Sequence, residues 1–211
     1  MIPTLGTGAP MSPAAPRGLH RESSRESAGA EPKEEDAMTD REPVEARNLD
    51  IYGSPELAWD GVRDALVAAL PKMETAAFLG TVRPDGRPHS AGIGPLWRDG
   101  DIFFVSGPGT RKSRNLAENP ACTLSVRTPS GDVVLEGTAE RVTDPGVLEP
   151  VAAAYREGGW PARVEGDAFT APFSAQSAGP PPWHLYRFDF HTVVALSTVE
   201  PYGAARWRFA S

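Results

Sequence analysis

Three clusters of turn-forming residues divide the middle of this chain into short apolar segments, and their spacing constrains the fold more than any other feature. The clusters are residues 83–86 (RPDG), 98–101 (RDGD) and 129–132 (PSGD). Proline, aspartate and glycine favour the backbone angles of tight turns. Tight turns join antiparallel strands, whereas parallel strands need long crossover connections. The spacing therefore predicts a mainly β chain with antiparallel strands.

The segments between the turns have the lengths and patterns of strands. Within residues 121–127, apolar side chains alternate with polar ones, as in a strand with one buried face. Five or six short antiparallel strands at this spacing indicate a closed or nearly closed β-barrel. The expected strands cover residues 75–82, 88–97, 102–106, 121–127, 133–142 and 183–198.

Three helices are expected beside the barrel. The first lies between Ser54 and Leu70, where Ser54 and Pro55 suit a helix start and Pro71 ends the apolar period. The second covers residues 111–118. The third begins after Asp144 and ends at the glycine pair 158–159.

Two segments fit neither period. Residues 1–47 carry almost no large apolar side chains, so we expect a disordered tail, followed by one domain over residues 48–211. Residues 160–182 are long for a structureless loop and contain aromatic side chains. This combination favours a flap that covers a site.

Composition excludes several classes of function. The formal net charge of −7 argues against nucleic-acid binding, and the longest apolar run, Ala65–Leu70, is too short to span a bilayer. The first residues lack the pattern of a secretory signal, so we expect a cytoplasmic protein. Cys122 is the single cysteine and the four histidines are scattered, so no metal site is expected.

A glycine-containing loop before the second helix predicts an anion site. Residues 106–115 read SGPGTRKSRN. The free N–H groups of a helix N-terminus attract anions. Arg111 and Lys112 occupy the first turn, where each positive charge opposes the helix dipole by about 0.3–1 kcal/mol. A bound phosphate would explain both cations, with Arg114 as a third. A solvated basic helix start is the alternative, and the spacing is not that of a P-loop.

The runs at residues 75–97, 99–126 and 133–142, with the closing YGAARWRF at 202–209, resemble a known family. This is the pyridoxamine 5′-phosphate oxidase-like FMN-binding split-barrel superfamily. Its branch of flavin- and deazaflavin (coenzyme F-420)-dependent oxidoreductases is the most similar. The resemblance implies a six-stranded, antiparallel, Greek-key-like split β-barrel that forms a homodimer with cofactor sites at the interface.

The resemblance also implies which residues hold the cofactor. The phosphate cluster carries over to Thr110, Arg111 and Lys112, and the strand segment 89–93 would lie along the ring. Glycine within that strand suits close approach by a flat ligand. Arg87 would contact phosphate or be a solvated turn residue, and Trp207 would reach the partner's site or pack in the barrel. The predicted cofactor site comprises Arg87, His89, Ser90, Ala91, Gly92, Ile93, Val105, Ser106, Thr110, Arg111, Lys112, Arg114 and Trp207.

The expected function is hydride transfer between a bound flavin-type cofactor and a small organic substrate. In such enzymes the cofactor carries the chemistry and the protein supplies position and electrostatics, so no catalytic side chain is assigned. FMN and F-420 both fit the predicted site. A composition rich in Ala, Arg, Gly and Pro is typical of GC-rich genomes and slightly favours F-420. The alternatives are a non-catalytic flavin or haem carrier and a structural barrel without a cofactor. The C-terminal substrate motif of pyridoxamine 5′-phosphate oxidase itself is not found.

Overall fold

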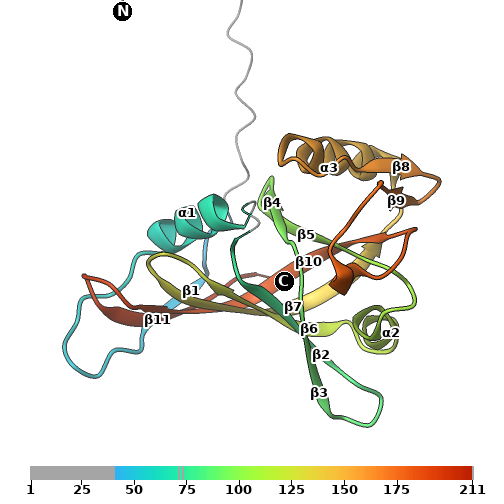
Figure 1. Ribbon diagram of the computed structural model, residues 1–211. Helices are drawn as coiled ribbons and strands as arrows, with labels where there is room; N and C mark the ends of the chain where they lie inside the picture. Colours follow the sequence, from blue (N-terminus) through green and yellow to red (C-terminus); the bar gives the residue numbers. More distant parts are fainter. Residues whose placement is uncertain (1–40, 71, 73, 211) are drawn as a thin grey trace, which may run out of the picture. The chain divides into compact units, whose positions relative to one another are not determined.

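Antiparallel strands form one continuous nine-stranded sheet, which runs in the order β1-β11-β10-β7-β6-β2-β3; β5 also pairs with β10, and β4 pairs with β5 (Figure 1). The computed structural model describes residues 41–70, 72 and 74–210; the predicted tail lies almost entirely outside these residues. The sheet strands are β1 (Glu45–Asn48), β2 (Ala77–Val82), β3 (Pro88–Gly92), β4 (Leu96–Arg98), β5 (Asp101–Ser106), β6 (Ala121–Arg127), β7 (Gly131–Val142), β10 (His184–Ser197) and β11 (Gly203–Arg208).

One face of this sheet forms the main core. A row of paired residues crosses five strands: Leu79 lies opposite Leu124, Leu124 opposite Leu135, Leu135 opposite Val193, and Val193 opposite Trp207. All five side chains are buried. Burial of each such side chain stabilises the fold by about 1.5–3 kcal/mol. The alternation that predicted the strands therefore also determines which face is buried.

Three α-helices accompany the sheet: α1 (Trp59–Ala69), α2 (Arg111–Glu118) and α3 (Pro145–Glu157). The predicted bounds of α2 are confirmed, and Asp144 caps α3 by accepting a hydrogen bond from the Gly146 N–H. The start predicted for α1 at Ser54 is wrong. The carboxylate of Asp50 accepts hydrogen bonds from the backbone N–H groups of Tyr52 and Ser54, so these residues form a turn and the helix begins later.

The predicted strand at residues 88–97 is two strands with different partners. β3 pairs with β2, whereas β4 pairs with β5. Pro95 separates them and has no N–H to donate to a ladder. The predicted tail boundary also needs correction, because its last residues, from Glu45, belong to β1 and pair with β11. β1 has no buried side chain, so no apolar pattern marks it.

The hydrogen-bonded strand order is open, so the closed barrel indicated by the turn spacing is not formed by these pairings, and the strands exceed the five or six expected. The long strand β10 is where the sheet divides. Its first half pairs with β5 on one side and its second half with β11, while β7 pairs along the other side. A bulge between Phe190 and Thr192 interrupts the β7 ladder. Such bulges bend a strand and increase its twist.

The segment predicted as a flap has local structure of its own. It contains the hairpin β8 (Arg163–Glu165) and β9 (Ala168–Thr170) and a 3₁₀ turn at Gln176–Ala178. Phe169 and Trp183 exchange backbone hydrogen bonds, which attaches the hairpin to the start of β10. Trp160, Phe169 and Trp183 form a second apolar cluster with residues of α3.

Candidate anion and cofactor site

The loop between β5 and α2 is organised by three hydroxyl groups. The Ser106 Oγ lies 2.8 Å from both the Thr110 Oγ1 and the Ser113 Oγ. The Thr110 Oγ1 also accepts a hydrogen bond of 3.3 Å from the Ser113 N–H, which caps α2. Serine and threonine favour this N-cap position because their oxygens satisfy a free helix N–H. The hydroxyls fix the start of α2 at the residues predicted to hold a phosphate.

Lys112 is buried beneath the chain's own backbone. Its side chain is 2% exposed, and its ammonium donates a hydrogen bond to the Ser177 carbonyl. Burial lowers the pKa of Lys112. A positive charge is rarely buried without an anionic partner. Lys112 forms no ion pair with any residue in the described part of the chain.

The segment 173–180 lies directly over this loop. The Gly107 N–H donates to the Ala178 carbonyl at 2.7 Å, and the Trp183 indole N–H donates to the Gly179 carbonyl at 2.9 Å. A Cβ at Gly107 would lie 2.8 Å from the Ala178 oxygen, so this close approach requires glycine. Backbone carbonyls of the covering segment therefore contact both the loop and the Lys112 ammonium.

The hairpin of β2 and β3 faces the same helix. The Asn115 amide donates a 2.9 Å hydrogen bond to the Thr81 Oγ1, which lies 3.4 Å from the His89 Nδ1. Asn115 and Thr81 are buried, and His89 is partly buried. This chain of contacts connects α2 to the imidazole on β3.

Positive charges from both the hairpin and α2 act on the imidazole of His89. Desolvation lowers the pKa of His89, and the positive charges of Arg83, Lys112 and Arg111 lower it further. The imidazole is therefore mainly neutral at pH 7 and can donate one N–H to a ligand. Three cations from two elements act on a single point beside the α2 N-terminus.

The structure brings most of the predicted site residues to these two elements. Ser106, Thr110, Arg111, Lys112 and Arg114 lie at the loop and on α2, with Arg111 and Arg114 exposed. Residues 89–92 lie on β3, followed by Ile93, and Val105 is half-buried near the end of β5.

Two predicted residues are placed differently. Arg87 forms an exposed ion pair of 2.6 Å with Asp85, so its charge is already compensated. Trp207 is 1% exposed and packs against Trp59, with 5.7 Å between the ring centroids. Trp207 is therefore a core residue in this protomer and is not brought to the anion loop. Barrel packing, one of the two roles expected for it, is the role that its position shows.

Sequence reasoning missed several residues of this site. Arg83 lies in a turn tetrapeptide, which predicts a solvated side chain. Thr81 and Asn115 are polar residues whose burial depends on how α2 packs against the hairpin. Ser177 contributes a backbone carbonyl, for which no side-chain signal exists. The Cys122 thiol is buried and its pKa is raised to about 12, so it is not a nucleophile.

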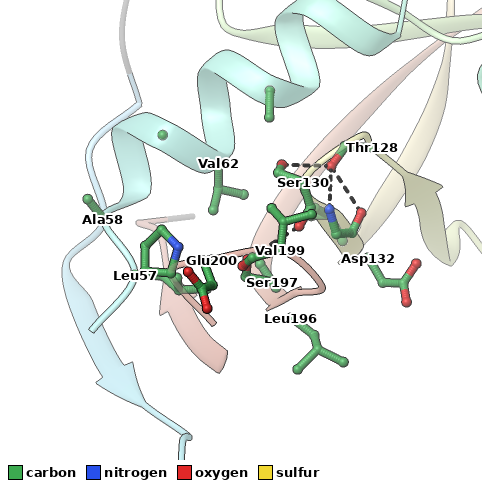
Figure 2. Close-up of a pocket in the computed structure, with 16 residues that line it drawn as sticks. Leu57, Ala58, Val62, Thr128, Ser130, Asp132, Leu196, Ser197, Val199 and Glu200 are labelled. Atoms are coloured by element: carbon green, nitrogen blue, oxygen red, sulfur yellow. Dashed lines mark hydrogen bonds between the residues drawn. The ribbon is translucent and has the colours of Figure 1, made fainter. Parts of the chain in front are cut away.

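A separate apolar cavity of about 270 Å³ lies between α1 and two turns of the sheet (Figure 2). Leu57 and Val62 line it from the helix side, Leu196 from the end of β10, and Val199 from the turn between β10 and β11. Thr128 closes the other turn by accepting a 3.1 Å hydrogen bond from the Gly131 N–H. None of the predicted cofactor residues lines this cavity.

Comparison with known proteins identifies relatives of the chain. A family model described as pyridoxamine 5′-phosphate oxidase matches residues 63–197. A pyridoxine/pyridoxamine 5′-phosphate oxidase of Bacteroides thetaiotaomicron is 38% identical over 74 residues. These residues make up 33% of this chain and 34% of that protein, so the match leaves most of the relative uncovered.

Solved structures show the same architecture at low identity. One chain, 17% identical, superposes with a TM-score of 0.51 and covers 72% of this chain and 94% of its own. An F420 reductase is 21% identical, with a TM-score of 0.41 over 60% of this chain and 93% of that one. An FMN-binding, pyridoxamine 5′-phosphate oxidase-related protein of Nostoc punctiforme is 21% identical, with a TM-score of 0.46 over 72% and 90%. Such identities bear on the fold alone, and of these three superpositions only the first carries weight.

No helix in the described residues is long and apolar enough to cross a membrane.

Proposed function

Since this chain belongs to the pyridoxamine 5′-phosphate oxidase family, we propose that it is an oxidoreductase that binds a phosphorylated flavin-type cofactor, FMN or F-420, at the α2 N-terminus. The observation that carries the proposal is Lys112, a buried ammonium without an anionic partner among the described residues, at a helix start that also carries Arg111. An anionic ligand is the missing partner that both residues fit.

The phosphate would give the buried Lys112 ammonium an anionic partner. Lys112 now donates to the neutral Ser177 carbonyl. That hydrogen bond is already strengthened by its charged donor, but only an anionic acceptor also compensates the buried positive charge. The free N–H groups of the first α2 turn would bind further phosphate oxygens. The ammonium has three donors, so Lys112 can bind the phosphate and keep its hydrogen bond to the Ser177 carbonyl.

The ring would lie along β3. Gly92 has no side chain, and the nearest atom to a Cβ built there is the Ala77 carbonyl oxygen at 4.0 Å. Small residues at positions 90–92 leave the strand open to a flat ligand. The bound cofactor would supply hydride transfer to or from a small organic substrate. The residues of this chain would position the ring, and neutral His89 would donate a hydrogen bond to it or to the substrate.

We also propose that two copies form a homodimer through the outer face of the sheet, where β2, β3, β5, β6, β7 and β10 correspond to the six-stranded split barrel of the family. On this face Phe78 lies opposite Ser125, Ser125 opposite Val134, and Val134 opposite Val194. Phe78 is 50% exposed, and so is Leu196 on the same face of β10. Ser125, Val134 and Val194 are half-buried between them. Exposed apolar side chains on one sheet face are typical of an interface.

Val134→Glu is expected to convert the dimer to a monomer, because it places a charge in the middle of this row. Light scattering coupled to size exclusion would measure the mass. Ile51→Glu is the matched control, since Ile51 is 83% exposed between β1 and α1 and does not belong to the row. A monomeric wild-type protein, or a Val134→Glu variant with the mass of a dimer, would contradict the proposed interface.

Titration of the purified protein with FMN and with F-420 tests the cofactor proposal directly. We expect saturable binding of one of them at micromolar affinity or better, followed by absorbance and fluorescence. Oxidation of the reduced, bound cofactor by an added organic acceptor would then establish an enzyme. Binding without any such turnover would favour the carrier alternative. Absence of binding for both ligands would refute the proposal.

A further inference from the structure

The β2–β3 turn contains two arginines with different environments. Arg87 donates to the Asp85 carboxylate through Nη2 at 2.6 Å and through Nε at 2.9 Å, and its side chain is 72% exposed. Arg83 forms no ion pair within the described residues, and its Nε is buried without a hydrogen-bond partner. The sequence RPDGR therefore contains one arginine in an ion pair and, a few residues away, one arginine that acts on Asp85 only through longer-range charge attraction.

Backbone hydrogen bonds hold Arg83 in place. Its N–H donates to the Arg87 carbonyl at 2.9 Å, and its own carbonyl accepts from the Gly86 N–H at 2.8 Å. Both bonds close the turn, so the position of the Arg83 backbone does not depend on its side chain. A buried N–H without an acceptor is unfavourable, and such groups in native proteins generally have a partner. The described residues supply none for the Arg83 Nε, which points to an acceptor from outside this part of the chain.

The Arg83 charge acts on a residue of the candidate anion and cofactor site. Among the positive charges that lower the pKa of His89, Arg83 has the largest effect, followed by Lys112 and Arg111. His89 is connected to α2 through Thr81 and Asn115. α2 packs against both strands of the hairpin. Arg83 thus acts, from the hairpin, on the same imidazole as the two cations in the first turn of α2.

We propose that Arg83 is a second anion-binding residue of the candidate site, and that it binds an anionic oxygen of the cofactor from the hairpin side. This inference rests on the proposed function, because the α2 loop must hold the first anionic group. A planar guanidinium with five donors suits phosphate and carboxylate oxygens equally. The ligand would be the phosphate itself, held between hairpin and helix, or an acidic group further along the cofactor.

The matched pair Arg83→Gln and Arg87→Gln tests the inference. Both variants remove one positive charge from the same turn. We expect Arg83→Gln to weaken cofactor binding at least tenfold and Arg87→Gln to change it less than twofold, with Arg83→Lys intermediate. The salt dependence of binding would be shallower for Arg83→Gln alone. Equal affinities for the two glutamine variants would overturn the inference.

Titration with two ligands distinguishes the two possible acceptors, the phosphate and the acidic tail. FMN carries a phosphate, whereas F-420 carries a phosphate and an acidic tail. If Arg83→Gln loses affinity for both ligands, Arg83 binds the phosphate. If it loses affinity for F-420 alone, Arg83 binds the acidic tail. If the wild-type protein binds neither cofactor, the proposed function fails. Titration of the same variants with pyrophosphate then decides the inference by itself, since identical binding by all of them would refute it.

The pKa of His89 provides a readout that does not depend on a ligand. Removing the Arg83 charge is expected to raise the pKa of His89, because this charge helps to lower it. Arg87→Gln is expected to leave it unchanged, since Arg87 is not among the charges that lower it. Proton NMR of the His89 ring across a pH titration would measure both. An unchanged pKa in Arg83→Gln would show that the charge does not face the site.

Discussion

The double variant Arg111→Gln/Lys112→Met is expected to bind its cofactor at least tenfold more weakly than the wild-type protein, which corresponds to about 1.4 kcal/mol or more. Both cations lie in the first turn of α2, and Lys112 has no anionic partner among the described residues. The variant removes the charges that compensate the phosphate but keeps the free N–H groups of the helix. Fluorescence titration with FMN and F-420 measures the loss.

The same variant is expected to stay folded. Methionine retains most of the buried volume of the Lys112 side chain, and the Ser177 carbonyl that loses its donor belongs to an exposed residue that water can reach. Removal of two first-turn cations also relieves about 0.3–1 kcal/mol of unfavourable dipole interaction for each. We therefore expect the thermal midpoint without ligand to be unchanged or slightly higher.

Arg114→Gln provides the comparison within the same helix. Arg114 is exposed one turn further along α2, so its loss is expected to weaken binding less than the double substitution does. If the double variant binds with wild-type affinity while remaining folded, the anion site is not at the α2 N-terminus. The proposed function would then lose the observation that carries it.

Gly137→Ala is expected to destabilise the protein by about 3 kcal/mol or more, because the added methyl group has no space. Its Cβ would lie 2.0 Å from the Asp189 carbonyl oxygen and 2.8 Å from the Phe190 Cα. These atoms belong to the backbone of β10, directly before the bulge between Phe190 and Thr192. Relief of the contact would require the two strands to separate where β10 changes partner.

Urea unfolding at constant m-value measures this effect. Gly61→Ala is the matched control, since a Cβ at Gly61 meets no atom within 4 Å and the residue is exposed on α1. Alanine there is expected to stabilise the protein by about 0.5–1 kcal/mol, because glycine is the weaker helix former. Equal stability of Gly137→Ala and the wild-type protein would mean that β7 and β10 do not approach as closely as the structure shows.

Those elements that were predicted with correct bounds depend on local chemistry. Residues 111–118 form α2 because Thr110 caps it and Asn119-Pro120 follows it, and both features act within a few residues. Residues 121–127 form β6 because their alternation matches the pleat of a strand. The first-turn cations could be recognised for the same reason, since the helix dipole opposes them wherever the helix lies in the fold.

The errors share a different cause. β1 is exposed along its whole length, so only its pairing with β11 makes it a strand. For Arg87 the sequence left open a phosphate contact or a solvated turn residue, and Arg83 was not considered; the structure pairs Arg87 with Asp85 and leaves the Arg83 Nε without a hydrogen-bond partner. Two arginines in one turn cannot be ranked without knowing which of them faces α2. Trp207 has a ring that could stack on a ligand, but it is buried in the core against Trp59.

The sequence by itself determined the antiparallel class, the positions of most strands and the anion loop before α2, because turn chemistry, alternation and helix dipoles act over short distances. Only the tertiary structure decided that segment 173–180 covers Lys112, that the β2–β3 hairpin faces α2, and that the strand order remains open at β10. These features arise from contacts between residues far apart in the chain. Burial and the loss of charge compensation depend on such contacts, and no local pattern encodes them.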